Sequence, residues 1–284
     1  MRRAIITLTI GAEYEAGWNA LSAPGWRAYA TRHCYDLLAI NQPLDTSARA
    51  ASRSPAWQKL LTLRPEVCGS YDRVVWLDSD IVINPEAPDV AAGVPLEKIG
   101  AVDEYMFPGH QPQLMKMIDW SLKQAPESEP IWRSYNNPSD YHAYWGLPNG
   151  MKHIVQTGVM VMSPIYHRDI FEDVYQNYDQ KRGVELNYEQ RPLSFEIQKR
   201  DLQHWIDLRF NALTMLRLYE YEQELKQKVS NRVELVAAIR HMYNKNYFLH
   251  FAGVQPLQRL TREALSSAPL RPGPFSSWFK QPTH

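Results

Sequence analysis

Short apolar segments rich in β-branched residues recur along the chain, and each has the length of a buried β-strand. The first covers residues 4–10 and is closed by Gly11. After residues 73–77, a polar break precedes residues 82–83, which resume extended structure. The predicted strands are 4–10, 36–40, 73–77, 82–83, 99–102, 155–162 and 247–251.

Stretches with helical spacing of apolar residues separate these strands. In residues 54–63, Ser54 can cap a helix and Pro55 suits its first position. Strands that alternate with helices predict an α/β fold, with a mostly parallel central sheet flanked by helices. The predicted helices are 18–35, with a break at Pro24-Gly25, and 54–63, 167–178 and 189–200.

Residues 106–152 differ from the rest, because they lack clean periodicity and are rich in Pro, Asn, Tyr and Trp. A long segment without secondary structure is uncommon inside a compact domain and is usually functional. We interpret it as an insertion over the functional face of a single domain, residues 1–265. Residues 266–284 are dominated by Pro and Ser and are predicted to be a C-terminal tail.

Composition narrows the class of protein. Of the 284 residues, 44% are hydrophobic and 22% charged, which is typical of a soluble globular chain. The 31 basic and 31 acidic residues cancel, which argues against a nucleic-acid binder that neutralises phosphates. No apolar run approaches the roughly 20 residues of a membrane span, so we expect a cytoplasmic protein. Cys34 and Cys68 are too few for a disulfide framework and are expected to be buried free thiols.

The strongest chemical signal follows the strand 73–77, where Asp78, Ser79 and Asp80 come at its carboxyl end. Ligands bind at that end of the strands in an open α/β sheet. Alternate residues of an extended chain face the same way, so the two carboxylates can point at one spot. Two oxygen ligands suit Mg²⁺ or Mn²⁺, which commonly complete their coordination with substrate phosphates.

A strand followed by Asp-Ser-Asp-Ile-Val resembles the metal-binding motif of the GT-A glycosyltransferases, and three later features fall in the same order. Gln156-Thr157-Gly158 stands where that family enters a strand through Asn-Ala-Gly, and Glu189-Gln190 resembles its acidic-Gln pair. The segment 248–253 resembles the His-Phe-x-Gly of the retaining branch that includes glycogenin-like and lipopolysaccharide galactosyltransferases. Val254-Gln255-Pro256 replaces the Lys-Pro-Trp that often follows. The resemblance covers about residues 1–255.

The resemblance implies that His250 is the third protein ligand of a divalent metal, with Asp78 and Asp80. On its own, a histidine in an apolar strand would be a satisfied core residue. Imidazole favours Mn²⁺ over Mg²⁺. Residues implied in holding the nucleotide-sugar co-substrate are Gly11, Lys59, Asp78, Ser79, Asp80, Gln156, Thr157, Gly158, Glu189, Gln190 and Gly253.

The implied activity is transfer of a hexose from a nucleoside-diphosphate sugar, with UDP as the expected nucleotide, to a hydroxyl of a saccharide or other acceptor. In the retaining branch Gln190 lies beside the sugar, and the departing phosphate serves as base. An inverting enzyme would need a carboxylate base, for which Asp103 and Glu104 are the candidates. The insertion would lie on the acceptor side, where four aromatic residues would either stack on sugars or pack the insertion: Trp120, Trp132, Tyr144 and Trp145.

Two other functions fit part of the pattern. Asp78-Ser79-Asp80-Ile81-Val82 also matches the nucleophile motif of haloacid-dehalogenase-type phosphatases. That motif normally opens the domain, and the only acidic pair with the required later spacing, Asp169 and Asp173, is predicted to lie within a helix. A catalytically inactive sugar-nucleotide-binding relative is the second alternative, against which the retained ligands argue.

Overall fold

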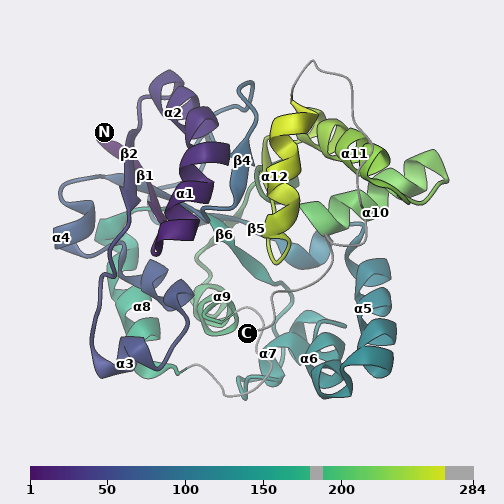
Figure 1. The fold of residues 1–284 in the computed structure, drawn as a ribbon. Coiled ribbons are helices and arrows are strands. Elements are labelled where there is room, and N and C mark those ends of the chain that lie inside the picture. The colour runs from purple at the N-terminus through teal and green to yellow at the C-terminus, as the bar shows by residue number, and fades with distance from the viewer. Residues whose placement is uncertain (180–187, 266–284) are drawn as a thin grey trace.

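The computed structural model describes residues 1–179 and 188–265 (Figure 1). In this part of the chain a central six-stranded sheet has the order β2-β1-β3-β6-β5-β7. Strand β6 is antiparallel to its neighbours β3 and β5, and the other pairs are parallel, so the mostly parallel α/β prediction is confirmed. The strands are β1 (Arg3–Leu8), β2 (Asp36–Ile40), β3 (Arg73–Leu77), β5 (Ile99–Asp103), β6 (Val155–Met162) and β7 (Gln203–Trp205).

Helices cover both faces of this sheet, which explains why β3 and β6 are buried along their whole length. One face packs against η1 (Pro55–Leu61), α8 (Pro164–Asn177) and α9 (Gln190–Lys199), through Trp57, Phe171 and Leu193 among others. The other face packs against α1 (Ala12–Leu21) and α2 (Ala23–Arg32). Two short helices, α3 (Ala48–Ala51) and α4 (Pro65–Cys68), flank η1 in the sequence.

A second sheet of three strands lies beside the first, with the order β4-β9-β8. Its strands are β4 (Ile81–Ile83), β8 (Ala212–Leu213) and β9 (Phe248–His250). Because β4 and β9 are antiparallel and Ile81 pairs with His250, a late histidine comes next to Asp80. Three helices that the pattern did not predict follow η4 (Leu208–Asn211) and pack in succession: α10 (Thr214–Leu225), α11 (Arg232–Lys245) and α12 (Gln255–Ala264).

The insertion is largely helical, which contradicts its description as a stretch without secondary structure. The short η2 (Glu104–Met106) leads into it, and it contains α5 (His110–Gln124), η3 (Pro126–Ser128), α6 (Glu129–Ser134) and α7 (Pro138–Ala143). These helices surround a small apolar cluster of their own, which includes Leu114, Ile118 and Tyr141. Apart from α5, these helices are too short for a clear apolar period to appear in the sequence.

The predicted break at Pro24-Gly25 is wrong by two residues, because α1 ends at Leu21 and Pro24 lies in the first turn of α2. Proline is tolerated there, since the N–H groups of a first turn have no helical partner. Gly25 allows close packing, because a Cβ at this position would lie 3.1 Å from the Ile83 carbonyl oxygen. The segment 54–63 forms a 3₁₀ helix, and Ser54 caps it by accepting a hydrogen bond from the Ala56 N–H.

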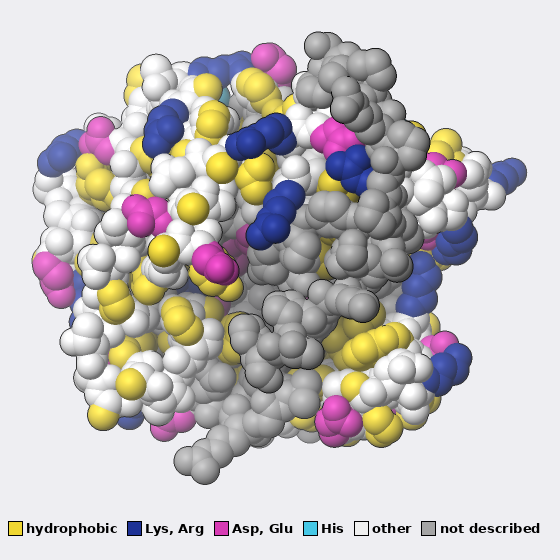
Figure 2. All heavy atoms as spheres, viewed as in Figure 1, with side chains coloured by type: hydrophobic (Ala, Val, Ile, Leu, Met, Phe, Trp, Pro, Cys, Tyr) yellow, Lys and Arg dark blue, Asp and Glu magenta, His cyan; other side chains and the backbone are white. Residues whose placement is uncertain are grey.

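Three smaller expectations have different outcomes. Cys68 is a buried free thiol, as expected, whereas Cys34 is free but exposed. The predicted tail, residues 266–284, lies outside the described residues. Among the helices that the structure describes, none has the length and apolar character needed to cross a bilayer. On the face shown in Figure 2, basic and acidic side chains are interspersed, in keeping with the zero net charge.

Candidate metal and donor site

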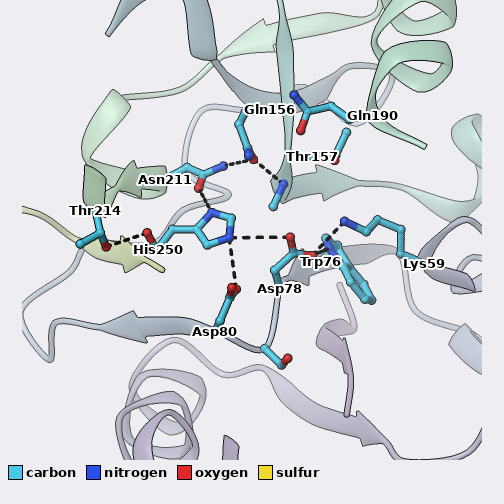
Figure 3. Close-up of polar contacts among 12 residues, drawn as sticks. Lys59, Trp76, Asp78, Asp80, Gln156, Thr157, Gln190, Asn211, Thr214 and His250 are labelled. Carbon is cyan, nitrogen blue, oxygen red and sulfur yellow. Dashed lines mark hydrogen bonds and ion pairs between the residues drawn. The ribbon is translucent and has the colours of Figure 1, made fainter. Parts of the chain in front are cut away.

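The Asp-Ser-Asp turn joins the two sheets, so its position is fixed from both sides (Figure 3). The Asp78 N–H donates to the carbonyl oxygen of Gly158 in β6 at 2.9 Å. The carbonyl oxygen of Asp80 accepts a hydrogen bond from the N–H of Phe251, directly after β9, at 3.2 Å. The Ser79 carbonyl accepts from Ser22 Oγ at 3.1 Å. The backbone therefore holds both carboxylates at the line where β3, β6 and β9 meet.

Asp78, Asp80 and His250 converge at this point. His250 Nε2 lies 3.2 Å from Asp80 Oδ1 and 3.8 Å from Asp78 Oδ2. One ligand atom from each residue lies within 4.8 Å of the others. Ligands about 2.1 Å from an octahedral ion lie about 3 Å from one another, so this donor set fits a single small divalent cation. The site is accessible from the Asp78 side, because the Asp78 side chain is 28% exposed and that of His250 only 2%.

The electrostatics of the three residues are those of a cation site. Burial lowers the pKa of the His250 imidazole, but Asp80 and Asp78 raise it by more, so the net shift is upward. Burial raises the pKa of Asp80, but His250 lowers it by more, so that carboxylate remains ionised. A bound divalent cation would take over the role of the imidazolium proton in neutralising the two carboxylates.

Asp78 offers only one oxygen to this site. Its Oδ1 accepts hydrogen bonds from Lys59 Nζ at 2.9 Å and from Trp76 Nε1 at 2.8 Å, which leaves Oδ2 facing His250. Trp76 was not among the predicted site residues. The alternation of side chains along β3 could have indicated it, because residues 76 and 78 face the same side of an extended chain.

Lys59 links the carboxylate turn to the start of α9. Its Nζ lies 2.9 Å from Glu189 Oε1, which also accepts a hydrogen bond from Thr157 Oγ at 3.1 Å. Burial opposes the charge on Lys59, but Asp78 and Glu189 outweigh it and raise the lysine pKa. Burial raises the pKa of Glu189 in spite of the nearby cation. Lys59, Thr157 and Glu189 were predicted as donor-binding residues and lie in one network.

Gln190 and the two candidate bases lie beside this network. Gln190 Nε2 donates to Glu104 Oε2 at 2.9 Å, and burial raises the Glu104 pKa. Asp103 Oδ2 lies 2.6 Å from His153 Nδ1, and its Oδ1 accepts from the N–H groups of Ile154 and Tyr105. Both oxygens of Asp103 are therefore engaged in holding the entry to β6, and its role as a base stays a prediction.

Three glycines belong to the predicted donor set. Gly158 makes room for the metal ligand, because a Cβ here would lie 2.3 Å from His250 Cε1. Gly11 precedes α1 with φ 101°, and Gly253 follows β9 with φ 69°. Both angles lie in the left-handed region that favours glycine, and contact of these two residues with a donor stays a prediction.

His250 is held by residues that the sequence did not indicate. Its Nδ1 lies 2.7 Å from Asn211 Oδ1, and its carbonyl oxygen accepts from Thr214 Oγ1 at 2.7 Å. Asn211 Nδ2 donates in turn to Gln156 Oε1 at 2.7 Å. Asn211 lies 39 positions before His250, in no recognisable motif, so local pattern could not have identified it.

The aromatic residues of the insertion divide into two groups. Trp145 is 6% exposed and packs in the main core, with its ring 6.4 Å from that of Trp57. Trp132 is partly buried beside Tyr135. Tyr144 and Trp120 are 40% and 47% exposed. Packing therefore explains Trp145 and Trp132, whereas Tyr144 and Trp120 each expose part of the ring to solvent.

Comparisons with solved structures identify the architecture. A glycosyltransferase involved in the glycosylation of the major capsid of PBCV-1 superposes with a TM-score of 0.51 at 14% identity, covering 93% of this chain and 98% of that one. The bifunctional glycosyltransferase WbbM superposes with a TM-score of 0.50 at 14% identity, covering 94% of this chain and 50% of that one. No family model and no curated protein matches the sequence.

The chain therefore has the GT-A glycosyltransferase fold, with Asp78 and Asp80 in the position of its Asp-x-Asp motif. This fold contradicts the phosphatase alternative. The acidic pair on which that alternative depended, Asp169 and Asp173, lies within α8.

Proposed function

We propose that the chain is a metal-dependent glycosyltransferase that moves a hexose from a nucleoside-diphosphate sugar to a hydroxyl of a saccharide or other acceptor. The observation that carries the proposal is the convergence of Asp78, Asp80 and His250 at the end of β3 within a GT-A fold. Two carboxylates and an imidazole suit Mn²⁺ better than Mg²⁺. UDP is the expected nucleotide, on the resemblance alone.

The residues of the site would have two roles, metal binding and neutralisation of the pyrophosphate charge. Asp78, Asp80 and His250 would hold the ion beside the pyrophosphate of the donor, where it would stabilise negative charge on the leaving oxygen. Lys59 keeps a positive charge next to Asp78 at a position 5% exposed, so its field is weakly screened by water. Since Val254-Gln255-Pro256 replaces the lysine-containing segment of the family, the ion and Lys59 would supply most of the neutralisation.

Retention is the stereochemical outcome that we propose. Both oxygens of Asp103 are engaged with the start of β6, and Glu104 is buried against Gln190 with a raised pKa. A carboxylate base for inversion would have to be ionised and open to the acceptor. Neither carboxylate meets both conditions in this arrangement, whereas attack from the leaving-group side needs no protein base.

The experiment combines a donor panel with a product assay. The protein would be warmed with Mn²⁺ and each of a set of nucleoside-diphosphate sugars, and the unfolding midpoint recorded. A matching donor should raise the midpoint only when Mn²⁺ is present. Slow hydrolysis of that donor, followed by NMR of the released sugar, would give the anomeric configuration. A midpoint shift without hydrolysis or transfer would support the inactive sugar-nucleotide-binding relative, and no shift with any donor would contradict both.

A further inference from the structure

We propose that Gln156 and Asn211 are positioning residues that fix the tautomer of His250, so that its Nε2 lone pair faces the metal. The inference rests on the proposed metal site and concerns how this chain prepares one of its ligands. A series of hydrogen bonds supports it, which begins at the Gly158 N–H in β6 and passes through the side chains of Gln156 and Asn211 to His250 (Figure 3).

The first step fixes the amide of Gln156. The Gly158 N–H lies 2.6 Å from the Gln156 side chain, and a backbone N–H can only donate. The Gln156 atom facing it must therefore be the carbonyl oxygen Oε1. The oxygen and nitrogen of an amide group have nearly the same shape, but here the hydrogen-bond donor decides between them.

The second step fixes the amide of Asn211. Gln156 Oε1 lies 2.7 Å from the Asn211 side chain and needs a donor there, so the facing atom is Nδ2. The opposite atom of the Asn211 amide is then the carbonyl oxygen Oδ1, which lies 2.7 Å from His250 Nδ1. An amide oxygen cannot donate, so His250 Nδ1 must carry the hydrogen.

The hydrogen on Nδ1 determines the state of the other ring nitrogen of His250, Nε2. A neutral imidazole has one N–H, so a hydrogen on Nδ1 leaves a lone pair on Nε2. Nε2 is the atom that lies 3.2 Å from Asp80 and 3.8 Å from Asp78. The opposite tautomer would place a hydrogen where the ion must bind. A hydrogen bond at the remote nitrogen is a common means of fixing a histidine ligand.

Because the three side chains are buried, each depends on its neighbour for its hydrogen bonds. The exposed fractions of Gln156, Asn211 and His250 are 6%, 0% and 1%, so water has little access to replace a lost partner. The lack of a side chain at Gly158 lets the ring lie against β6. Each member of the series would leave a buried polar atom unsatisfied if its neighbour were removed, which costs more than a surface hydrogen bond.

The same contacts revise the role of Gln156. The resemblance placed it among residues that contact the donor sugar. Its Oε1 already accepts from the Gly158 N–H and from Asn211 Nδ2, which uses both lone pairs of that oxygen. We therefore assign its main role to His250.

Two matched pairs of variants test the proposal. Asn211→Ala and Gln156→Leu remove the amide oxygens. Gln156→Glu keeps an acceptor for the Gly158 N–H and for Asn211 Nδ2, whereas Asn211→Asp keeps the acceptor for His250 Nδ1 but loses the donor to Gln156 Oε1. We expect Mn²⁺ affinity, measured by calorimetry without donor or turnover, to fall about 10- to 100-fold in the first pair. Gln156→Glu should stay closest to wild type, and Asn211→Asp should retain hydrogen on His250 Nδ1 at a cost in stability. Unfolding curves identify any variant that fails to fold. If Asn211→Ala fails to fold, the two Gln156 variants provide the test instead.

The spectroscopic measurement is independent of metal binding. Protein labelled with ¹⁵N-histidine would be titrated with base until the His250 ring is neutral, and its two nitrogens distinguished by their shifts. Wild type should show hydrogen on Nδ1 alone, and Asn211→Ala a mixture or the opposite tautomer. Hydrogen on Nε2 in wild type, or unchanged Mn²⁺ affinity in a folded Asn211→Ala, would overturn the proposal. Failure of wild type to bind Mn²⁺ would overturn the proposed metal site instead, and the tautomer would still be decided.

Discussion

Lys59 Nζ lies 2.9 Å from Glu189 Oε1, and the two side chains are 6% and 3% exposed. We predict that Lys59→Met lowers the free energy of unfolding by about 3 to 5 kcal/mol, because it leaves a buried carboxylate without its cation. Lys59→Met with Glu189→Gln should recover much of that loss. Urea unfolding of the two variants and wild type measures the difference. A single variant within about 1 kcal/mol of wild type would contradict the buried pair.

The same double variant separates stability from donor binding. If Lys59 contributes positive potential to the pyrophosphate site, the stabilised double variant should still bind nucleoside diphosphate more weakly than wild type. Recovery of both stability and affinity would limit Lys59 to a structural role.

Asp80→Asn should abolish Mn²⁺ binding and lower transfer by at least about 100-fold, because loss of the ion removes several kcal/mol of leaving-group stabilisation. The metal-free protein should lose about 1 to 3 kcal/mol, since the charged contact with His250 is also removed. Calorimetry with Mn²⁺ and a donor hydrolysis assay are the measurements. Asp169→Asn is the control, because Asp169 is exposed on α8 and matters only to the excluded phosphatase chemistry.

Gly158→Ala tests the contact between β6 and the metal ligand. A Cβ would lie 2.3 Å from His250 Cε1, so the ring must move away from the carboxylates. We expect Mn²⁺ affinity to fall about tenfold or more and stability to fall by about 1 to 3 kcal/mol. Gly17→Ala in α1 is the control, because a Cβ there meets nothing within 4 Å and should be neutral or stabilising. Unchanged Mn²⁺ affinity in a folded Gly158→Ala would show that His250 is not a ligand.

The pH dependence of stability should reflect His167, a fully buried residue in the first turn of α8, whose pKa burial lowers from 6.5 to about 4. The unfolded chain takes up a proton below about pH 6.5, whereas the folded protein does not, so stability is lost as the pH falls. Between pH 7 and pH 5 this group should cost about 2 kcal/mol. In His167→Asn, whose amide oxygen can still accept from the Ser163 N–H, urea unfolding should show a shallower slope. An unchanged slope would contradict the assignment.

The sequence was sufficient to predict the elements that build the site. Residues 73–77 and 155–162 form strands with the predicted bounds, because buried strands have apolar runs with clear ends. The partly exposed edge strand 36–40 also has the predicted bounds. The order of the motifs along the chain predicts that Asp78, Asp80 and His250 act together, through the resemblance to the GT-A glycosyltransferases. Their meeting depends on the antiparallel pairing of β4 with β9, which no local pattern encodes.

The parts that could not be predicted depend on contacts between distant segments. Asn211 holds His250 from a short 3₁₀ helix that has no sequence signature. Helix α11 buries Leu235, Val236, Ala238, Ile239 and Met242, but these apolar residues do not by themselves show that α10 and α12 cover them. The helices of the insertion share one small core, and apart from the 15-residue α5 each is too short to show its pattern alone.

Substitutions of Trp145 and Tyr144 separate the two roles proposed for the aromatic residues of the insertion. Trp145→Ala should lose about 3 to 5 kcal/mol of stability, because a buried indole is removed from the main core. Tyr144 is half-exposed, and the guanidinium carbon of Arg191 lies 5.0 Å from its ring, next in sequence to Gln190. Its exposed ring could therefore stack on an acceptor sugar close to the donor. Tyr144→Ala should leave the unfolding midpoint and slow donor hydrolysis nearly unchanged while transfer falls, and Tyr144→Phe should retain most of the transfer. Equal loss of hydrolysis and transfer in Tyr144→Ala would place the acceptor elsewhere.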